Sequence, residues 1–273
     1  MSFPTPHIRS SRSVHTHTAI LLHGRGSNGP EFAEEFLSCK TSQGKTLPDS
    51  LPNWRWVLPT SRLRWNAVFE EEMCAWFDAA SLDDIQMRQD LQVAGLRESV
   101  SHILNILEEE IKLLDGRADR VYLGGISQGM AISLWTLLCA PGRIHAPLGG
   151  LVGFCGWLPF AHQAEQVLKQ SGSLQRKRLV SDLFRRTIAE PEDLPQRDAD
   201  DLSVLNTPVF LSHGVDDPWV SVNLGRQAAK VLQGMEIQTE WNEFTGAEGD
   251  GHWVKEPEGF DQILRFIEKQ EQK

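Results

Sequence analysis

The sequence predicts an α/β fold in which helices cover both faces of a mostly parallel central sheet. Short apolar segments alternate along the chain with longer amphipathic ones, which is the order that strands and crossover helices take in such folds. The short segments are mostly apolar, as expected for strands that are buried on both faces. The chain has 273 residues, 40% of them hydrophobic, so we expect one large domain over residues 1–273.

Six of the short apolar segments are predicted as strands. They are Thr18–Leu22, Trp54–Leu58, Arg120–Gly124, Gly150–Phe154, Pro208–Ser212 and Glu236–Glu240. The longest predicted helix carries an apolar stripe and ends at Asp115-Gly116, a C-terminal glycine signal. The last helix starts at Pro257, a favoured first-turn residue. The predicted helices are Gln86–Leu114, Ser127–Cys139, Val222–Leu232 and Pro257–Lys269.

Residues 160–206 break the alternation of strands and helices. They contain helical fragments but no clear strand, and basic side chains give way to acidic ones. Because long connections in compact domains are often lids, we interpret this segment as an inserted cap or lid; a solvated surface excursion is the alternative. Residues 1–17 are polar, and we expect them to form a flexible N-terminus.

The composition argues against several classes of protein. Lysine and arginine number 27 against 37 acidic residues, a net charge of −10, whereas bulk nucleic-acid binding needs a dense positive surface. No apolar run approaches the roughly 20 residues that cross a bilayer, and the N-terminus lacks the apolar core of a secretory signal. The four cysteines lie far apart, which disfavours a disulfide framework or a zinc site. We therefore expect a cytoplasmic protein without a metal site.

The most specific motif is Gly125-Ile126-Ser127-Gln128-Gly129, a G-x-S-x-G pattern between a predicted strand and a predicted helix. This is the setting of a nucleophile elbow, in which a tight turn lifts the serine hydroxyl above the sheet. Glycines two residues on either side let the neighbouring chain approach without Cβ clashes. The motif predicts that Ser127 is a catalytic nucleophile.

A serine hydroxyl needs a base to take its proton, and hydrolases of this type place an acid and then a histidine after the serine. Two adjacent carboxylates, Asp216 and Asp217, follow the strand Pro208–Ser212, and His252 lies on a glycine-rich loop before the last helix. We expect Ser127, Asp217 and His252 to form a triad, with His252 as base and then acid. Spacing alone leaves Asp216 as the alternative acid.

Two other histidines are weaker candidates for the base, because His23 and His213 each end a strand just before a glycine. An imidazole at such a position more often hydrogen-bonds the loop backbone than abstracts a proton. The sequence also contains no HExxH motif, which disfavours a metal hydrolase.

Acyl transfer also requires N–H donors for the developing oxyanion. One donor is expected from Gln128, the residue after the nucleophile, and the other from the loop after an early strand. His23-Gly24-Arg25-Gly26 occupies that position, and the Arg25 N–H is the candidate. The Arg25 side chain either orients an acidic substrate group or faces solvent.

Five blocks together resemble the acyl-protein thioesterase/lysophospholipase family, the phospholipase–carboxylesterase branch of the α/β-hydrolases. In order they are Leu22-His23-Gly24-Arg25-Gly26-Ser27, Ala75-Trp76-Phe77-Asp78, Gly124-Gly125-Ile126-Ser127-Gln128-Gly129, Cys155-Gly156-Trp157-Leu158-Pro159, and His213-Gly214 through Asp217-Pro218-Trp219-Val220. The resemblance extends over residues 18–268. It implies an α/β-hydrolase fold, Asp217 as the acid, and Arg25 and Gln128 as oxyanion donors. It also implies hydrolysis of thioester or ester bonds to acyl chains without metal or cofactor.

The departures from the family pattern lie on the rim or walls of the expected site. Arg25 stands where the family usually has leucine, and Ser27 where it has aspartate. Trp219 replaces a smaller apolar residue, Trp253-Val254-Lys255 follows the histidine, and the excursion from Pro159 to Thr207 is longer than in compact members. These positions leave the natural substrate open.

The expected substrate is an acylated protein or a small acyl ester or thioester. A small-ester or pathway-specific carboxylesterase is one alternative, and a non-catalytic binding protein with the same fold is another. Arg176-Lys177-Arg178 and Arg185-Arg186 favour either transient contact with an anionic membrane surface or a solvated helix face. The sequence does not indicate an oligomeric state.

Nine tryptophans are the unusual feature of the composition. Trp54, Trp56 and Trp135 lie in or beside predicted elements and are expected in the core. Four others lie in or beside the motif blocks, and we expect them to line the substrate pocket, because large rigid rings suit an acyl site. These are Trp76, Trp157, Trp219 and Trp253, with Trp65 as a further candidate.

Overall fold

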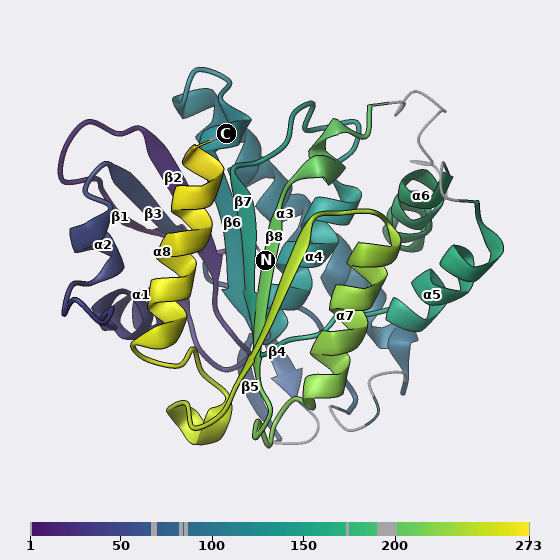
Figure 1. The fold of residues 1–273 in the computed structure, drawn as a ribbon. Helices are drawn as coiled ribbons and strands as arrows, with labels where there is room; N and C mark the ends of the chain where they lie inside the picture. The colour runs from purple at the N-terminus through teal and green to yellow at the C-terminus, as the bar shows by residue number, and fades with distance from the viewer. Residues whose placement is uncertain are drawn as a thin grey trace.

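A seven-stranded sheet forms the centre of the computed structural model, which describes residues 2–66, 70–81, 84, 87–172, 175–189 and 201–272 (Figure 1). The strand order is β1-β3-β2-β6-β7-β8-β9, and every pairing is parallel except that of β1 with β3. The strands are β1 (His7–Arg9), β2 (His17–Leu22), β3 (Trp54–Leu58), β6 (Val121–Ile126), β7 (Gly150–Phe154), β8 (Val209–Gly214) and β9 (Thr239–Phe244). The predicted α/β class is therefore confirmed.

The last strand lies a few residues later in the chain than predicted. Segment 236–240 was expected to be a strand, but β9 begins only at Thr239. Glu236 has a φ of 60°, and the Ile237 N–H donates to the Leu232 carbonyl 3.0 Å away. These contacts end the preceding helix in a tight turn, and strand pairing starts after it.

The N-terminus is also different from the prediction. Residues 1–17 were expected to be flexible, but His7–Arg9 pair antiparallel with β3. Farther on, the Thr16 N–H donates to the Asn53 carbonyl (3.0 Å), and Arg12 forms an ion pair with Asp49. The segment is ordered because it satisfies the outer edge of β3, which would otherwise be an open sheet edge.

Helices cover both faces of the sheet (Figure 1). On one face, α1 (Gly29–Ser38) and α8 (Glu258–Glu271) contribute a cluster of phenylalanines against the sheet. On the other face lie α3 (Gln92–Leu113), α4 (Gln128–Cys139) and α7 (Val222–Gly234). Every residue of α4 is buried, so this helix lies at the centre of the layer of helices on that face. Of the described helices, none is both long and apolar enough to span a bilayer.

The segment predicted as a cap or lid forms two described helices, α5 (Ala161–Gln170) and α6 (Arg176–Ile188). They pack against the α4 side of the molecule. Phe184 of α6 stacks edge-on against Trp135 with ring centroids 4.6 Å apart, and the Ser181 hydroxyl donates to the Leu138 carbonyl (2.8 Å). Residues 173, 174 and 190–200, with most of the acidic stretch, lie outside the described residues, and a lid role for residues 160–206 stays a prediction.

A separate two-stranded hairpin was not predicted. It consists of β4 (Arg62–Asn66) and β5 (Glu71–Ala75). Figure 1 shows it at the lower end of the view, below the central sheet. The short helix α2 (Leu47–Ser50) follows α1 and starts with a complete capping box at Thr46 and Asp49.

Candidate active site

Ser127 occupies a strained turn between β6 and α4. Its φ of 57° and ψ of −121° lie outside the regions that non-glycine residues normally adopt. The surrounding structure holds this conformation: the Ser127 N–H donates to the Phe154 carbonyl (2.9 Å). A Cβ on Gly129 would lie 2.1 Å from the Leu22 oxygen, and one on Gly125 would lie 2.6 Å from the Gly129 carbonyl carbon. Only glycine fits at either position, so the predicted nucleophile elbow is present.

Asp217 and His252 come from two loops that follow β8 and β9. The Nδ1 atom of His252 lies 2.7 Å from Oδ2 of Asp217. With Nδ1–H donating to the carboxylate, the Nε2 atom is left to act as a base. The other carboxylate oxygen accepts N–H bonds from Trp219 and Val220, both 2.9 Å long. The pair is therefore fixed in the orientation that a catalytic triad requires.

The protonation state of Asp217 follows from its contacts. Burial by itself would raise the pKa of this carboxyl, but hydrogen bonds from His213, His252 and the Val220 N–H outweigh it and hold the pKa well below its ordinary value. Asp217 thus stays ionised at neutral pH. Its neighbour Asp216 accepts from the Gly246 N–H (2.7 Å) instead. The geometry favours Asp217 over Asp216 as the acid.

The elbow and the Asp217–His252 pair follow adjacent strands of one sheet. Ser127, Cys155 and Asp217 lie just past β6, β7 and β8, which are neighbours in the strand order. Cys155, the residue after the carbonyl that holds Ser127, places its sulfur within 4.8 Å of ligand atoms of Asp217 and His252. Burial raises the pKa of this thiol to about 12, so it stays protonated and is poorly suited to bind a metal.

The other two strand-end histidines bind the backbone, as predicted. His23 is fully buried; its Nε2 accepts from the Ser61 N–H (3.0 Å) and its Nδ1 lies 2.6 Å from the Gly24 oxygen. Burial lowers the pKa of His23 to about 4, so it is neutral. The Nε2 atom of His213 lies 2.8 Å from the Val220 oxygen and 3.3 Å from Asp217. Neither imidazole is available as the base.

The loop with the candidate oxyanion donor is anchored beside the elbow. A Cβ on Gly24 would lie 3.4 Å from the Ser127 Cβ. On the other side of Arg25, the Gly26 N–H donates to the Cys74 carbonyl of β5 (2.8 Å). The backbone of Arg25 is therefore held between the nucleophile and the β4–β5 hairpin, which is where a donor to the oxyanion is needed.

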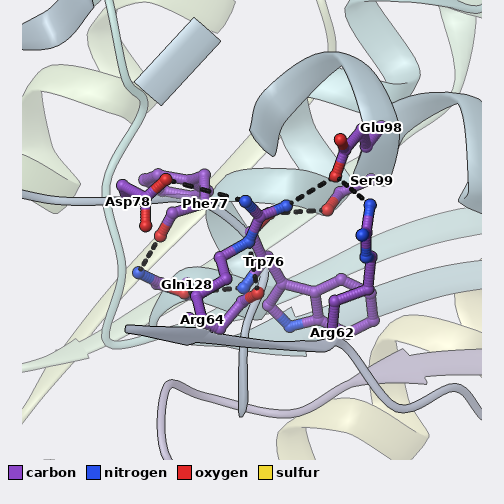
Figure 2. Close-up of polar contacts among 9 residues, drawn as sticks. Arg62, Arg64, Trp76, Phe77, Asp78, Glu98, Ser99 and Gln128 are labelled. Atoms are coloured by element: carbon purple, nitrogen blue, oxygen red, sulfur yellow. Dashed lines mark hydrogen bonds and ion pairs between the residues drawn. The ribbon is translucent and has the colours of Figure 1, made fainter. Parts of the chain in front are cut away.

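Gln128 supports the same arrangement from the other side. Its amide Oε1 accepts from the Trp76 N–H and its Nε2 donates to the Phe77 carbonyl, each over 3.1 Å (Figure 2). The indole of Trp76 donates to the His23 carbonyl (2.8 Å). As the first residue of α4, Gln128 has an N–H without a partner in its own helix. This N–H is the second candidate donor.

The predicted tryptophans lie in three different environments. Trp76 and Trp157 are buried in the core. Trp253 packs against Phe32 and Phe36 with centroids 6.1 and 6.4 Å apart, while Trp219 is 57% exposed next to Asp217. The expectation that all four rings form one pocket wall does not match these positions.

A pocket of about 280 Å³ opens beside the Arg25 loop, and it is formed largely by the hairpin and the segment after it. Its lining is Arg25, Arg64, Trp65, Met73, Ala75, Phe77, Asp78, Ala79, Ala80 and Leu91. Of the predicted tryptophans only the further candidate, Trp65, is among them. Sequence reasoning missed Arg64 and Met73 because it missed the hairpin.

Comparison with known proteins shows the family of the chain. A family model described as phospholipase/carboxylesterase matches residues 4–178. Acyl-protein thioesterase 1 of Gibberella zeae is 26% identical over 97% of this chain and 95% of its own length, and its Cryptococcus neoformans namesake is 26% identical over 82% and 75%. The crystal structure of Zea mays acyl-protein thioesterase 2 superposes with a TM-score of 0.66. The match covers 98% of this chain and 99% of the maize chain, at 23% sequence identity. Since the family model covers more than half of the chain, the protein belongs to the phospholipase/carboxylesterase family of α/β-hydrolases.

Proposed function

We propose that the protein is a serine hydrolase that cleaves acyl thioester or carboxylic ester bonds through an acyl-enzyme on Ser127. The observation that supports this most directly is the 2.7 Å bond between His252 and Asp217, two strands from a serine in a strained elbow. A hydrogen-bonded base next to a raised nucleophile is the arrangement needed for acyl transfer.

The proposed mechanism uses side chains and N–H groups of the chain and one water molecule. His252 Nε2 takes the proton from the Ser127 hydroxyl as its oxygen attacks the carbonyl carbon. The N–H groups of Arg25 and Gln128 bind the resulting oxyanion. His252 then protonates the departing thiolate or alkoxide, and the acyl group remains on Ser127. In the second half, His252 deprotonates a water molecule that hydrolyses the acyl-enzyme. Asp217 stabilises the imidazolium in both halves.

The substrate class is proposed from the relatives and from the pocket. Relatives that match most of this chain are named acyl-protein thioesterase 1, which supports acylated proteins as substrates. A cytoplasmic location is proposed from the sequence, which lacks the apolar core of a secretory signal. Trp219 and Trp253, next to Asp217 and His252, are proposed as the rim that substrates pass. The basic residues of α6 are a proposed site of transient membrane contact, although Lys177 and Arg185 already bind Asn206 and Asp182.

A second candidate, a carboxylesterase for short substrates, is favoured by one observation. The pocket beside the Arg25 loop has a volume of only about 280 Å³ and includes two arginines and an aspartate. A long saturated acyl chain would leave such charges buried against hydrocarbon, which is unfavourable.

The test is hydrolysis of acyl esters and acyl thioesters of graded chain length by purified protein. We expect activity in the wild type and a fall of at least about 10³-fold in Ser127→Ala, because the nucleophile is lost. Ser38→Ala, at an exposed position at the end of α1, is the matched control and should behave as wild type. Undiminished turnover in Ser127→Ala, or no labelling of Ser127 by a fluorophosphonate, would instead indicate a different nucleophile or a non-catalytic binding protein.

A further inference from the structure

We propose that His23 is a positioning residue of the candidate active site: its imidazole holds the Gly24 carbonyl and so turns the Arg25 N–H toward the oxyanion. The inference rests on the proposed function, because it explains how one of the two candidate donors in that mechanism is aimed. His23 is fully buried, so it acts through the backbone and not by touching the substrate.

The two nitrogens of the His23 ring have different partners, and together these partners define one tautomer. The Ser61 N–H can only donate, so the Nε2 atom 3.0 Å away accepts and carries no proton. The proton is therefore on Nδ1, which donates to the Gly24 carbonyl oxygen 2.6 Å away. Burial lowers the pKa of His23 to about 4, so the ring stays neutral and keeps this tautomer at neutral pH.

The Gly24 carbonyl and the Arg25 N–H belong to the same peptide unit. This unit is trans, since the only cis peptide bond among the described residues precedes Pro257, and in a trans unit the C=O and N–H point in opposite directions. With the carbonyl bound by the buried ring of His23, the N–H lies on the side away from the imidazole. A Cβ on Gly24 would lie 3.4 Å from the Ser127 Cβ, so this donor is next to the nucleophile.

The peptide units on either side are held by other segments. The Trp76 indole donates to the His23 carbonyl (2.8 Å), which fixes the unit before, and the Gly26 N–H donates to the Cys74 carbonyl (2.8 Å), which fixes the unit after. For the middle unit the constraint comes from the imidazole. It is needed there because Gly24 has no side chain that would limit the rotation of this peptide.

Two substitutions at residue 23 separate the two hydrogen bonds of the ring. The amide nitrogen of asparagine is as many bonds from the backbone as the Nδ1 atom of histidine. His23→Asn can therefore still donate to the Gly24 carbonyl, but it does not reach the Ser61 N–H. Glutamine is one carbon longer and brings its amide oxygen near the position of Nε2, so His23→Gln can keep the Ser61 bond and loses the Gly24 bond.

The measurements are the kinetics of p-nitrophenyl butyrate hydrolysis and inhibition by hexyl trifluoromethyl ketone. The ketone forms a hemiketal with the nucleophilic serine and thereby places a negatively charged oxygen at the donors. We expect His23→Gln to lower kcat by about 10²-fold, the low end for loss of one oxyanion donor, with little change in KM. Inhibition by the ketone should weaken by a similar factor.

His23→Asn should retain kcat and ketone inhibition close to wild type, although it loses the Ser61 bond. His102→Gln is the control for replacing a histidine elsewhere, because His102 lies in α3 and stacks on Phe3; it should match wild type in both measurements. Equal losses in His23→Asn and His23→Gln, or a change in KM alone, would overturn the inference while leaving the hydrolase assignment intact.

If the wild type neither hydrolyses the ester nor binds the ketone, it is the proposed function that fails. Crystal structures of the two variants then decide the inference. The Gly24–Arg25 peptide should be rotated in His23→Gln and unchanged in His23→Asn, and an unchanged peptide in both would refute the role of His23. If neither variant folds, proton–nitrogen couplings of the ring in the wild-type protein replace this test: a proton on Nδ1 supports the inference, and a proton on Nε2 would overturn it.

Discussion

Asp217 accepts hydrogen bonds on both carboxylate oxygens. One oxygen receives the N–H groups of Trp219 and Val220, and the other receives His252, with His213 at 3.3 Å. The backbone bonds fix the carboxylate, and the fixed carboxylate selects the tautomer of His252. The role that we propose for this residue is therefore to set a proton position, beyond contributing a negative charge.

Replacing Asp217 with asparagine should preserve the fold but place the wrong group next to His252. An amide NH₂ facing Nδ1 stabilises the tautomer with Nε2–H, which cannot accept the serine proton. We expect kcat to fall by about 10⁴-fold with little change in KM, as in the serine-protease template. The measurement is steady-state kinetics on a short neutral ester.

Asp216→Asn is the matched control for that substitution. Its carbonyl oxygen can still accept from the Gly246 N–H, so we expect a far smaller loss. If the two variants lose activity equally, the assignment of the acid to Asp217 is wrong.

At the scale of elements, the elbow depends on how closely α4 approaches the end of β2. The Cα of Gly129 faces the carbonyl of Leu22, and a Cβ at this position would lie only 2.1 Å from that oxygen. The helix cannot shift away, because every one of its residues is buried and close-packed interiors relax little. The glycine thus decides how near the helix N-terminus lies to the loop that carries the candidate oxyanion donor.

Gly129→Ala should destabilise the protein by about 3 kcal/mol, the upper part of the range for overpacking a tight site, and should also lower kcat. Urea unfolding and ester kinetics give the two quantities. Gly172→Ala is the control, because a Cβ there would meet no atom within 4 Å; its unfolding free energy should stay within about 0.5 kcal/mol of wild type. Equal effects would show that the elbow tolerates a wider turn.

The elements that the sequence predicted are those with a strong period or a motif. The buried strands were predicted because they are short apolar runs, and the triad is proposed because its candidate members follow strand ends. The hairpin was missed because β4 and β5 are not apolar runs: each carries two charged residues among its five. Arg62-Leu63-Arg64-Trp65 does alternate polar and apolar residues, a two-residue period that would have indicated a strand. Had the hairpin been predicted, Arg64 would have been a candidate for a residue that lines the pocket.

Long-range packing explains the other errors. The polar N-terminal residues His7–Arg9 pair with the edge of β3, a long-range contact that nothing local in their sequence indicates. Similarly, Trp76 and Trp157 lie in motif blocks, but the depth of their burial depends on helices far away in the chain. The position of a tryptophan beside a motif indicates that it lies near the site. It does not indicate whether the ring lines the pocket or is buried in the core.

At the scale of the whole molecule, stability should depend on pH through His23. Burial lowers its folded pKa to about 4 from 6.5, so between these values the unfolded chain binds more protons than the folded one. The stabilisation is complete above pH 6.5 and is lost as the pH falls toward 4. The difference of about 2.5 pH units corresponds to about 3 kcal/mol in total.

Urea unfolding of wild type and His23→Gln at pH 7 and pH 5 measures this contribution. The wild type should lose about 2 kcal/mol more than the variant between the two conditions. An NMR titration of the wild type provides an independent check, since the His23 imidazole should stay neutral down to about pH 5. A variant with the same pH slope as wild type, together with a His23 that titrates near 6.5, would contradict the expectation.

The loop of residues 23–26, with the proposed oxyanion donor, is finally held by contacts from three segments: Ser61, residues 74–76 and Ser127. His23 is bound by Ser61 and Trp76, Gly26 by Cys74, and Gly24 rests on Ser127. A loop with so many internal partners has little freedom to lose when a ligand arrives, so the entropic cost of ordering the receptor is small. Rigid-body docking against the unliganded structure should therefore reproduce bound poses at this loop. Covalent inhibitors for the protein can accordingly be designed with a fixed receptor backbone there.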